Sequence, residues 1–243
     1  MDYPNIQTYL GENWVEIQKK VIEGKSWIRK DVDKYLILRI EHAMFKKIDR
    51  LIDQFKACPR FIEWVTEVQT NDKNFEDLLL ELFCLEEITR NSDKFIFRLE
   101  NIENKSVTEG YVSKFGLEFY IEVSNIRKLK GSPIKKAQHL FEKSKKKFKG
   151  NKGLHFVGCS SQIEHDANLN EYYERNFVEL MKEVQKRLED PKRRNENLLG
   201  VIFLNMVVTI NPEKEITIHK KYTLFPNTKK GMTMGSLKRL INQ

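Results

Sequence analysis

Hydrophobic and polar positions repeat with two periods along the chain, and the first part of the chain shows only the helical one. Apolar residues at helical spacing predict helices near residues 6–23, 31–55 and 60–69. A further helix is predicted from Asn74, which can act as its N-cap, to about Ile88. No strand pattern precedes this helix, so we expect a helical N-terminal extension.

After this helix the pattern changes to an alternation of apolar and polar side chains. Phe95–Glu100, Thr108–Val112 and Leu117–Ser124 each alternate, which predicts three successive strands. The last two of these strands are expected to form a tight hairpin. Because every second side chain of a strand lies on the same face, Glu122 is expected to share a face with Ser124.

The rest of the chain predicts helices and strands in turn. The predicted segments are a helix over Pro133–Lys149, a strand over Leu154–Gly158, a helix over Leu169–Leu188 and strands over Leu198–Ile210 and Ile216–Phe225. A meander that continues through helical crossovers gives an α/β fold with a mixed central β-sheet flanked by helices. We expect a helical N-terminal extension over residues 1–72, an α/β core over 73–228 and a basic C-terminal tail over 229–243 that frays.

Positive charge is concentrated in one segment of the chain, residues 127–152. This segment contains eleven lysines and arginines and a single acid, Glu142, whereas the whole chain carries a formal net charge of +8. The remainder of the chain is therefore close to neutral. Such a concentration of charge is what a protein needs to bind a polyanion and displace its counterions, so we expect a nucleic-acid partner.

Two glutamates stand on either side of the predicted hairpin, Glu109 in its first strand and Glu122 in its second. Carboxylates brought together across adjacent strands repel each other unless they share a proton or a hard divalent cation. Glu122 also lies between Ile121 and Val123, where burying an acid is costly unless a charged group meets it. An acidic pair beside a basic segment favours phosphodiester chemistry that uses Mg²⁺ or Mn²⁺.

Other kinds of site find little support in the sequence. Cys58, Cys84 and Cys159 are widely spaced and form no Cys-x-x-Cys pair, which argues against a disulfide framework or a zinc site. The five histidines show no metal-ligand spacing. The amino terminus lacks a leader pattern, and the most apolar run, Leu198–Ile210, is too short to span a bilayer. We therefore expect a cytoplasmic protein with no membrane partner.

The order of elements and the placement of these acids resemble the restriction-endonuclease-like, or PD-(D/E)xK, nuclease superfamily over residues 74–225. In that family a helix contributes a glutamate, the second strand an acid, and the third strand an E-x-K pair whose lysine positions or activates the attacking water. The resemblance assigns these acidic roles to Glu81, Glu109 and Glu122 in turn. It implies a Mg²⁺-dependent endonuclease whose metal is held by Glu109, Glu122 and the carbonyl of Val123.

The sequence departs from the family pattern at the lysine, because Ser124 stands in its place. Some members of the family carry this lysine on another element, commonly the helix that follows, which begins here with Lys135 and Lys136. We favour Lys136 as the catalytic lysine, with Lys128 and Lys130 as further candidates. The lysines expected to contact the nucleic-acid backbone are Lys128, Lys130, Lys135, Lys143, Lys145, Lys146, Lys147 and Lys149.

Three functions are compatible with this pattern. The leading hypothesis is a nuclease that acts on DNA or RNA, with DNA placed first, and the resemblance implies that two copies pair to cut both strands. The second is an inactive module of the same fold that binds nucleic acid in a salt-sensitive manner without metal-dependent turnover. The third is a protein-interaction module whose lysine-rich helix is only a solubilising surface.

Overall fold

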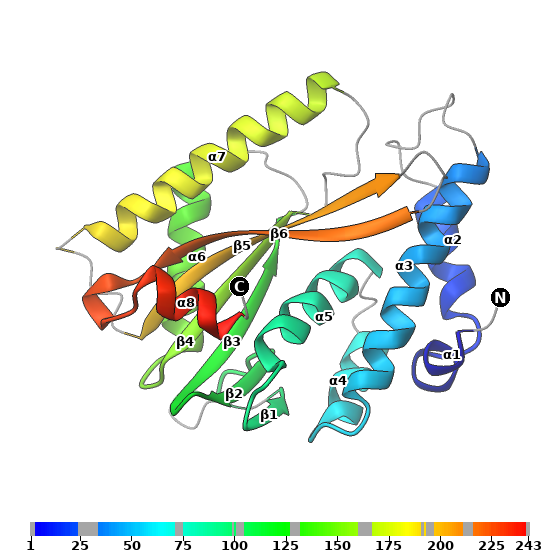
Figure 1. The fold of residues 1–243 in the computed structure, drawn as a ribbon, viewed down its shortest axis with the longest axis horizontal. Helices are drawn as coiled ribbons and strands as arrows, with labels where there is room; N and C mark the ends of the chain where they lie inside the picture. Colours follow the sequence, from blue (N-terminus) through cyan, green and yellow to red (C-terminus); the bar gives the residue numbers. More distant parts are fainter. Residues whose placement is uncertain are drawn as a thin grey trace.

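In the computed structural model of the chain, a mixed six-stranded sheet is covered by helices on both faces (Figure 1). The structure describes residues 3–23, 34–70, 75–98, 100, 105–126, 132–159, 167–190, 192, 197–210 and 216–241. This α/β architecture confirms the fold class expected from the sequence.

The first part of the described chain is helical, as its hydrophobic periodicity predicts. The helices are α1 (Pro4–Leu10), α2 (Trp14–Glu23), α3 (Lys34–Phe55), α4 (Phe61–Thr70) and α5 (Phe75–Thr89). The expected boundary between extension and core, at residues 72 and 73, falls outside the described residues.

The six strands lie side by side in the order in which they occur in the sequence. They are β1 (Lys94–Phe97), β2 (Gly110–Lys114), β3 (Leu117–Asn125), β4 (Gly153–Cys159), β5 (Leu198–Ile210) and β6 (Ile216–Pro226). The pairs β1–β2, β2–β3 and β5–β6 are antiparallel, whereas β3–β4 and β4–β5 are parallel. The parallel pairs are joined by two crossover helices, α6 (Pro133–Lys147) and α7 (Ala167–Glu189).

The two faces of the sheet bury two separate clusters of apolar side chains. On one face α6 and α7 cover the sheet, with Leu140 of α6 and Phe177 of α7 in the same cluster as Phe203 of β5. On the other face lie α3, α5 and the C-terminal helix α8 (Met234–Leu240) (Figure 1). Because side chains of β3 alternate, Ile121 contributes to this second cluster and Tyr120 to the first.

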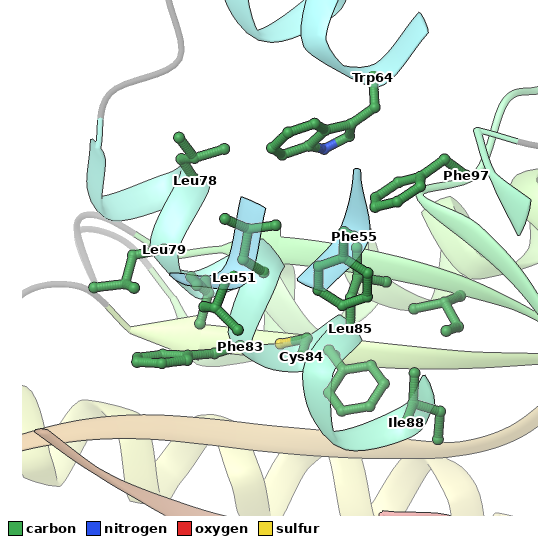
Figure 2. Packing of buried hydrophobic residues seen from close by; sticks show 14 of the residues in the cluster. Leu51, Phe55, Trp64, Leu78, Leu79, Phe83, Cys84, Leu85, Ile88 and Phe97 are labelled. Atoms are coloured by element: carbon green, nitrogen blue, oxygen red, sulfur yellow. The ribbon is translucent and has the colours of Figure 1, made fainter. Parts of the chain in front are cut away.

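The larger cluster surrounds α5, which is buried on most sides. Figure 2 shows Trp64 of α4 above this helix, beside Phe97 of β1 and Phe55 of α3. The ring centroids of Trp64 and Phe97 are 5.5 Å apart, and those of Phe55 and Phe97 are also 5.5 Å apart. One continuous core therefore joins the N-terminal helices to the sheet.

Residues 228–241 form two helices, which differs from the frayed tail expected from the charges of its lysines. A short 3-10 helix, Thr228–Lys230, is followed by α8, whose Thr233 side chain accepts a hydrogen bond from the backbone amide of Ser236. Leu237, Leu240 and Ile241 are buried in the larger cluster, so apolar packing outweighs the local charge. No helix within the described ranges is long and apolar enough to cross a membrane.

Candidate active site

The two glutamates singled out by the sequence lie at neighbouring points of the β2–β3 hairpin. Glu109 precedes β2, and its backbone amide donates a hydrogen bond of 3.0 Å to the carbonyl of Ile121, the residue before Glu122. The side chain of Glu122 is only 1% exposed. Burial raises the pKa of the Glu122 carboxyl, and the negative charge of Glu109 raises it further. The two carboxyl groups therefore lie within electrostatic reach of each other.

Two lysines of α6 face the buried carboxylate of Glu122. The ammonium nitrogen of Lys143 is 2.7 Å from Oε1, and that of Lys147 is 3.7 Å from Oε2. These lysines are four residues apart, which places both on one face of the helix. Their charges oppose the effects of burial and of Glu109 on the pKa of Glu122. Within the described part of the chain, Glu122 Oε2 accepts no hydrogen bond.

The ammonium group of Lys143 also reaches the position at which the family motif has its lysine. Lys143 Nζ donates to Ser124 Oγ at 2.9 Å and to the carbonyl oxygen of Val123 at 3.5 Å. A lysine of the crossover helix α6 thus places its ammonium group between Ser124 and Glu122. Lys136, the lysine favoured from the sequence, lies seven residues earlier on α6, about 10 Å along the helix axis.

Glu109 is held by an arginine that sequence analysis did not single out. Arg98, which follows β1, donates from Nη1 to Glu109 at 2.8 Å, and its Nη2 also pairs with Glu67 of α4. Burial lowers the pKa of the Arg98 guanidinium, but the charges of Glu109, Glu67 and Glu81 hold it above its ordinary value. Arg98 therefore links Glu109, at the start of β2, to Glu67 of the N-terminal helix α4.

Glu81 is buried in α5, where its carboxylate accepts a hydrogen bond of 2.6 Å from the indole nitrogen of Trp64. Its charge acts on Arg98, which places it on the Arg98 side of the cluster. The structure thus gathers the three acids named from the sequence around two sets of cations, Arg98 at one end and Lys143 with Lys147 at the other.

The donor atoms of this cluster are those that a hard divalent cation uses. Glu109 and Glu122 would hold Mg²⁺ or Mn²⁺ together with the carbonyl oxygen of Val123, and the unsatisfied Oε2 of Glu122 fits such a role. The described residues include no group of three or more His, Cys, Asp or Glu side chains suited to a metal. The protein ligands would therefore be few, which suits Mg²⁺ because this ion keeps several oxygen ligands from water or phosphate.

The described lysines of the basic segment differ in their exposure to solvent. Lys143 and Lys147 are partly buried at the cluster, whereas Lys135, Lys145, Lys146 and Lys149 are exposed. Lys128 and Lys130 lie outside the described residues. A cavity of about 810 Å³ is lined by side chains that include Lys94, Tyr111, Tyr120 and Lys152. Tyr120 stands two residues before Glu122 on β3, about 7 Å along the strand.

Comparison with known proteins gives little beyond the structure itself. No family model and no curated protein matches the chain. A solved structure of SfsA from Pyrococcus furiosus in complex with Ca²⁺ is similar over 60% of each chain, with 12% identity and a TM-score of 0.25. The chain thus covers less than two thirds of the SfsA chain. The relation is distant and weak, and no residue role is transferred from it.

Proposed function

We propose that this protein is a metal-dependent nuclease that hydrolyses phosphodiester bonds of nucleic acid, with DNA as the first substrate to test. The observation that carries the proposal is the contact of Lys143 with both Glu122 and Ser124. It restores, from α6, the pairing of an acid with a lysine that the third-strand motif of PD-(D/E)xK nucleases provides. Glu109 beside Glu122 completes the acidic pair.

In this proposal Glu109 and Glu122 hold the metal ion, assisted by the carbonyl of Val123. When bound, the ion supplies Lewis acidity that lowers the pKa of a water molecule and neutralises charge on the phosphate. Arg98 orients the Glu109 carboxylate through its hydrogen bond of 2.8 Å. Glu81 acts at a distance, because its charge and that of Glu67 help to keep the Arg98 guanidinium in place.

Lys143 is the residue that we assign to the lysine role, in place of Lys136. Its ammonium group can hold the attacking water or a non-bridging phosphate oxygen, which stabilises the charge that develops on the phosphate. Lys147, 3.7 Å from Glu122, adds positive charge on the same side. Both lysines would exchange part of their contact with Glu122 for contact with the substrate once the carboxylate binds a cation.

The exposed lysines of α6 supply the substrate contacts that precede chemistry. Lys145 and Lys146 of α6, and Lys149 just beyond its end, face solvent next to the two lysines of the cluster, so a phosphate backbone crossing this end of the helix would meet several positive charges. The cavity lined by Tyr111 and Tyr120 can receive the nucleotide that flanks the scissile phosphate.

A second function, nucleic-acid binding without hydrolysis, is favoured by one observation. Glu122 already pairs with Lys143 and Lys147, so a metal ion would have to compete with two ammonium groups for this carboxylate. If the carboxylate does not exchange these partners for a cation, the protein will bind a polyanion and leave it intact. Both functions predict salt-sensitive binding, and they differ in whether a divalent ion binds at Glu122 and supports turnover.

The test compares wild type with Glu122→Gln, Lys143→Met and the matched control Lys145→Met, which removes an exposed lysine of the same helix. Cleavage of end-labelled single-stranded and duplex DNA and RNA is followed with Mg²⁺ or Mn²⁺ and with chelator. Metal binding is measured in parallel as the shift in melting temperature caused by Mg²⁺, because a ligand that binds only the folded state stabilises it.

The nuclease proposal predicts cleavage that needs metal, is abolished in Glu122→Gln and falls about 100-fold or more in Lys143→Met, while Lys145→Met changes mainly the affinity. The Mg²⁺ shift should disappear in Glu122→Gln. Salt-sensitive binding with neither cleavage nor a metal shift would select the binding function. Cleavage by Glu122→Gln at the wild-type rate would reject the assigned site.

A further inference from the structure

A buried histidine lies directly behind Ser124 and Lys143. His155 stands in β4 opposite Glu122 and is fully buried. Both of its ring nitrogens are in hydrogen-bond contact, Nε2 with Ser124 Oγ at 2.8 Å and Nδ1 with Ser144 Oγ at 2.6 Å. The contacts connect β3, β4 and α6 in one row of polar side chains within an otherwise apolar layer.

The direction of each hydrogen bond in this row follows from the number of protons available. Ser144 donates its single hydroxyl proton to the carbonyl of Leu140 at 2.9 Å, so its oxygen must accept from His155 Nδ1. At the other end an ammonium group can only donate, so Ser124 Oγ accepts from Lys143 Nζ. The hydroxyl proton of Ser124 is then free to go to His155 Nε2.

The neutral ring with its proton on Nδ1 is the form that fits these hydrogen-bond directions. The opposite tautomer would place an unprotonated Nδ1 against Ser144, whose proton already belongs to the Leu140 carbonyl. A doubly protonated ring would donate from Nε2 to Ser124 Oγ, which already accepts from Lys143, and the hydroxyl proton of Ser124 would lose its acceptor at Nε2. Burial, aided by the charges of Lys143 and His139, lowers the pKa of His155 to about 3, in agreement with a neutral ring.

We propose that His155, as the neutral Nδ1–H tautomer, is a positioning residue that acts through Ser124 to hold the ammonium group of Lys143 at the candidate active site. His155 takes the hydroxyl proton of Ser124 and so turns the serine lone pairs toward Lys143. The serine at the motif position thereby serves as the acceptor that captures a lysine from α6. When Glu122 turns to a cation, the bond to Ser124 keeps Lys143 beside the substrate. This role rests on the proposed nuclease function.

Two substitutions of His155 separate this role from simple packing. Glutamine can place its amide oxygen near the position of Nε2 and accept from Ser124, whereas asparagine is shorter and can replace only the donor at Nδ1. We therefore expect His155→Gln to retain kcat within about three-fold of wild type. His155→Asn and Ser124→Ala should lower kcat about 10- to 100-fold, as the loss of an orienting contact commonly does, with KM little changed.

Two readouts do not depend on activity. Nitrogen NMR of ¹⁵N-histidine-labelled protein, without metal, should show one ring that is protonated at Nδ1 and disappears in His155→Gln. Crystal structures of the same two variants with Glu122→Ala added, which removes the carboxylate that also holds Lys143, should keep Lys143 Nζ on Ser124 Oγ in His155→Gln and show it displaced in His155→Asn. A wild-type ring protonated at Nε2, or Lys143 unmoved in His155→Asn, would overturn the positioning role. If wild type does not cleave nucleic acid, the nuclease proposal fails while these two readouts still decide the hydrogen-bond order.

Discussion

Acidification is expected to destabilise this protein through His155 before the ordinary carboxyl groups titrate. A histidine is half-protonated near pH 6.5 in an unfolded chain, whereas burial lowers the pKa of His155 to about 3 in the folded protein. Between these values the unfolded state binds the proton and the folded state does not. The contribution of the neutral ring is therefore complete above pH 6.5 and is lost as the pH falls.

The size of this effect follows from the shift in pKa. Between pH 7 and pH 4, His155 should lower the free energy of unfolding by about 3 kcal/mol, at roughly 1.36 kcal/mol per pH unit. Urea denaturation followed by tryptophan fluorescence, at pH 7, 5.5 and 4 with chelator present, measures this loss. His155→Gln is expected to be less stable at pH 7 but to lose less on acidification, so its gap to wild type should narrow.

Two features of this experiment separate His155 from other titrating groups. The raised pKa of Glu122 acts in the opposite direction, and because both proteins contain Glu122 it largely cancels in the comparison. His139→Gln removes an exposed histidine of α6 whose charge is the smallest of the causes that lower the pKa of His155, so this variant should follow wild type closely. If wild type and His155→Gln lost the same free energy of unfolding between pH 7 and pH 4, the reasoning would be refuted. The His155 ring would then have the same pKa in the folded and unfolded states.

Three further substitutions test the packing around the sheet, each by urea denaturation at pH 7. Lys114→Met removes a buried ammonium group that donates to three backbone carbonyls at helix ends, and we expect a loss of about 1–3 kcal/mol; an unchanged midpoint would contradict this. Gly158→Ala places a methyl group 2.2 Å from Leu80 Cδ2, which should cost about 1–3 kcal/mol unless that side chain can move. Trp64→Phe leaves the carboxylate of Glu81 without its indole donor and should cost about 1–3 kcal/mol, a larger loss than the change in ring size alone predicts.

The bounds of helices and strands could be predicted where one hydrophobic pattern persists over many residues. Leu198–Ile210 is a strand over that same range, and the strand expected over Leu117–Ser124 ends one residue later. The mixed sheet flanked by helices also agreed with the sequence, because a meander joined to helical crossovers permits few arrangements. The C-terminal helix was missed, because its buried Leu237 and Leu240 are too few to establish a period against the surrounding lysines.

The lysine of the site could not be chosen from the sequence, although a signal for it was present. The run from Lys143 to Lys149 looks like one solvated surface, and only the fold shows that Lys143 and Lys147 turn inward. The signal was the presence of polar residues at positions where the hydrophobic pattern predicts buried apolar side chains. Ser144 stands in the buried stripe of α6, and His155 stands in a strand buried on both faces, so each needed a polar partner.

Arg98 and Glu67 were missed for a different reason. Arg98 follows β1 with a φ of 50°, in the left-handed region, so the alternation of the preceding strand does not give the direction of its side chain. Glu67 lies on a helix that the sequence assigns to the N-terminal extension, and nothing in its spacing connects it to the hairpin. Contacts between distant segments such as these depend on tertiary packing.

The direction of the two crossovers explains why one face of the sheet needs helices from elsewhere in the chain. The connections through α6 and α7 advance in one direction across the sheet, and right-handed connections of that kind must pass over the same side. The opposite side would be a bare apolar surface, prone to self-association, if α3, α5 and α8 did not shield it. A protein shortened to begin at Phe75 would keep α5, α8 and the lysine-bearing helix α6 but would lose α3, and the apolar side chains that α3 covers would then be exposed to water.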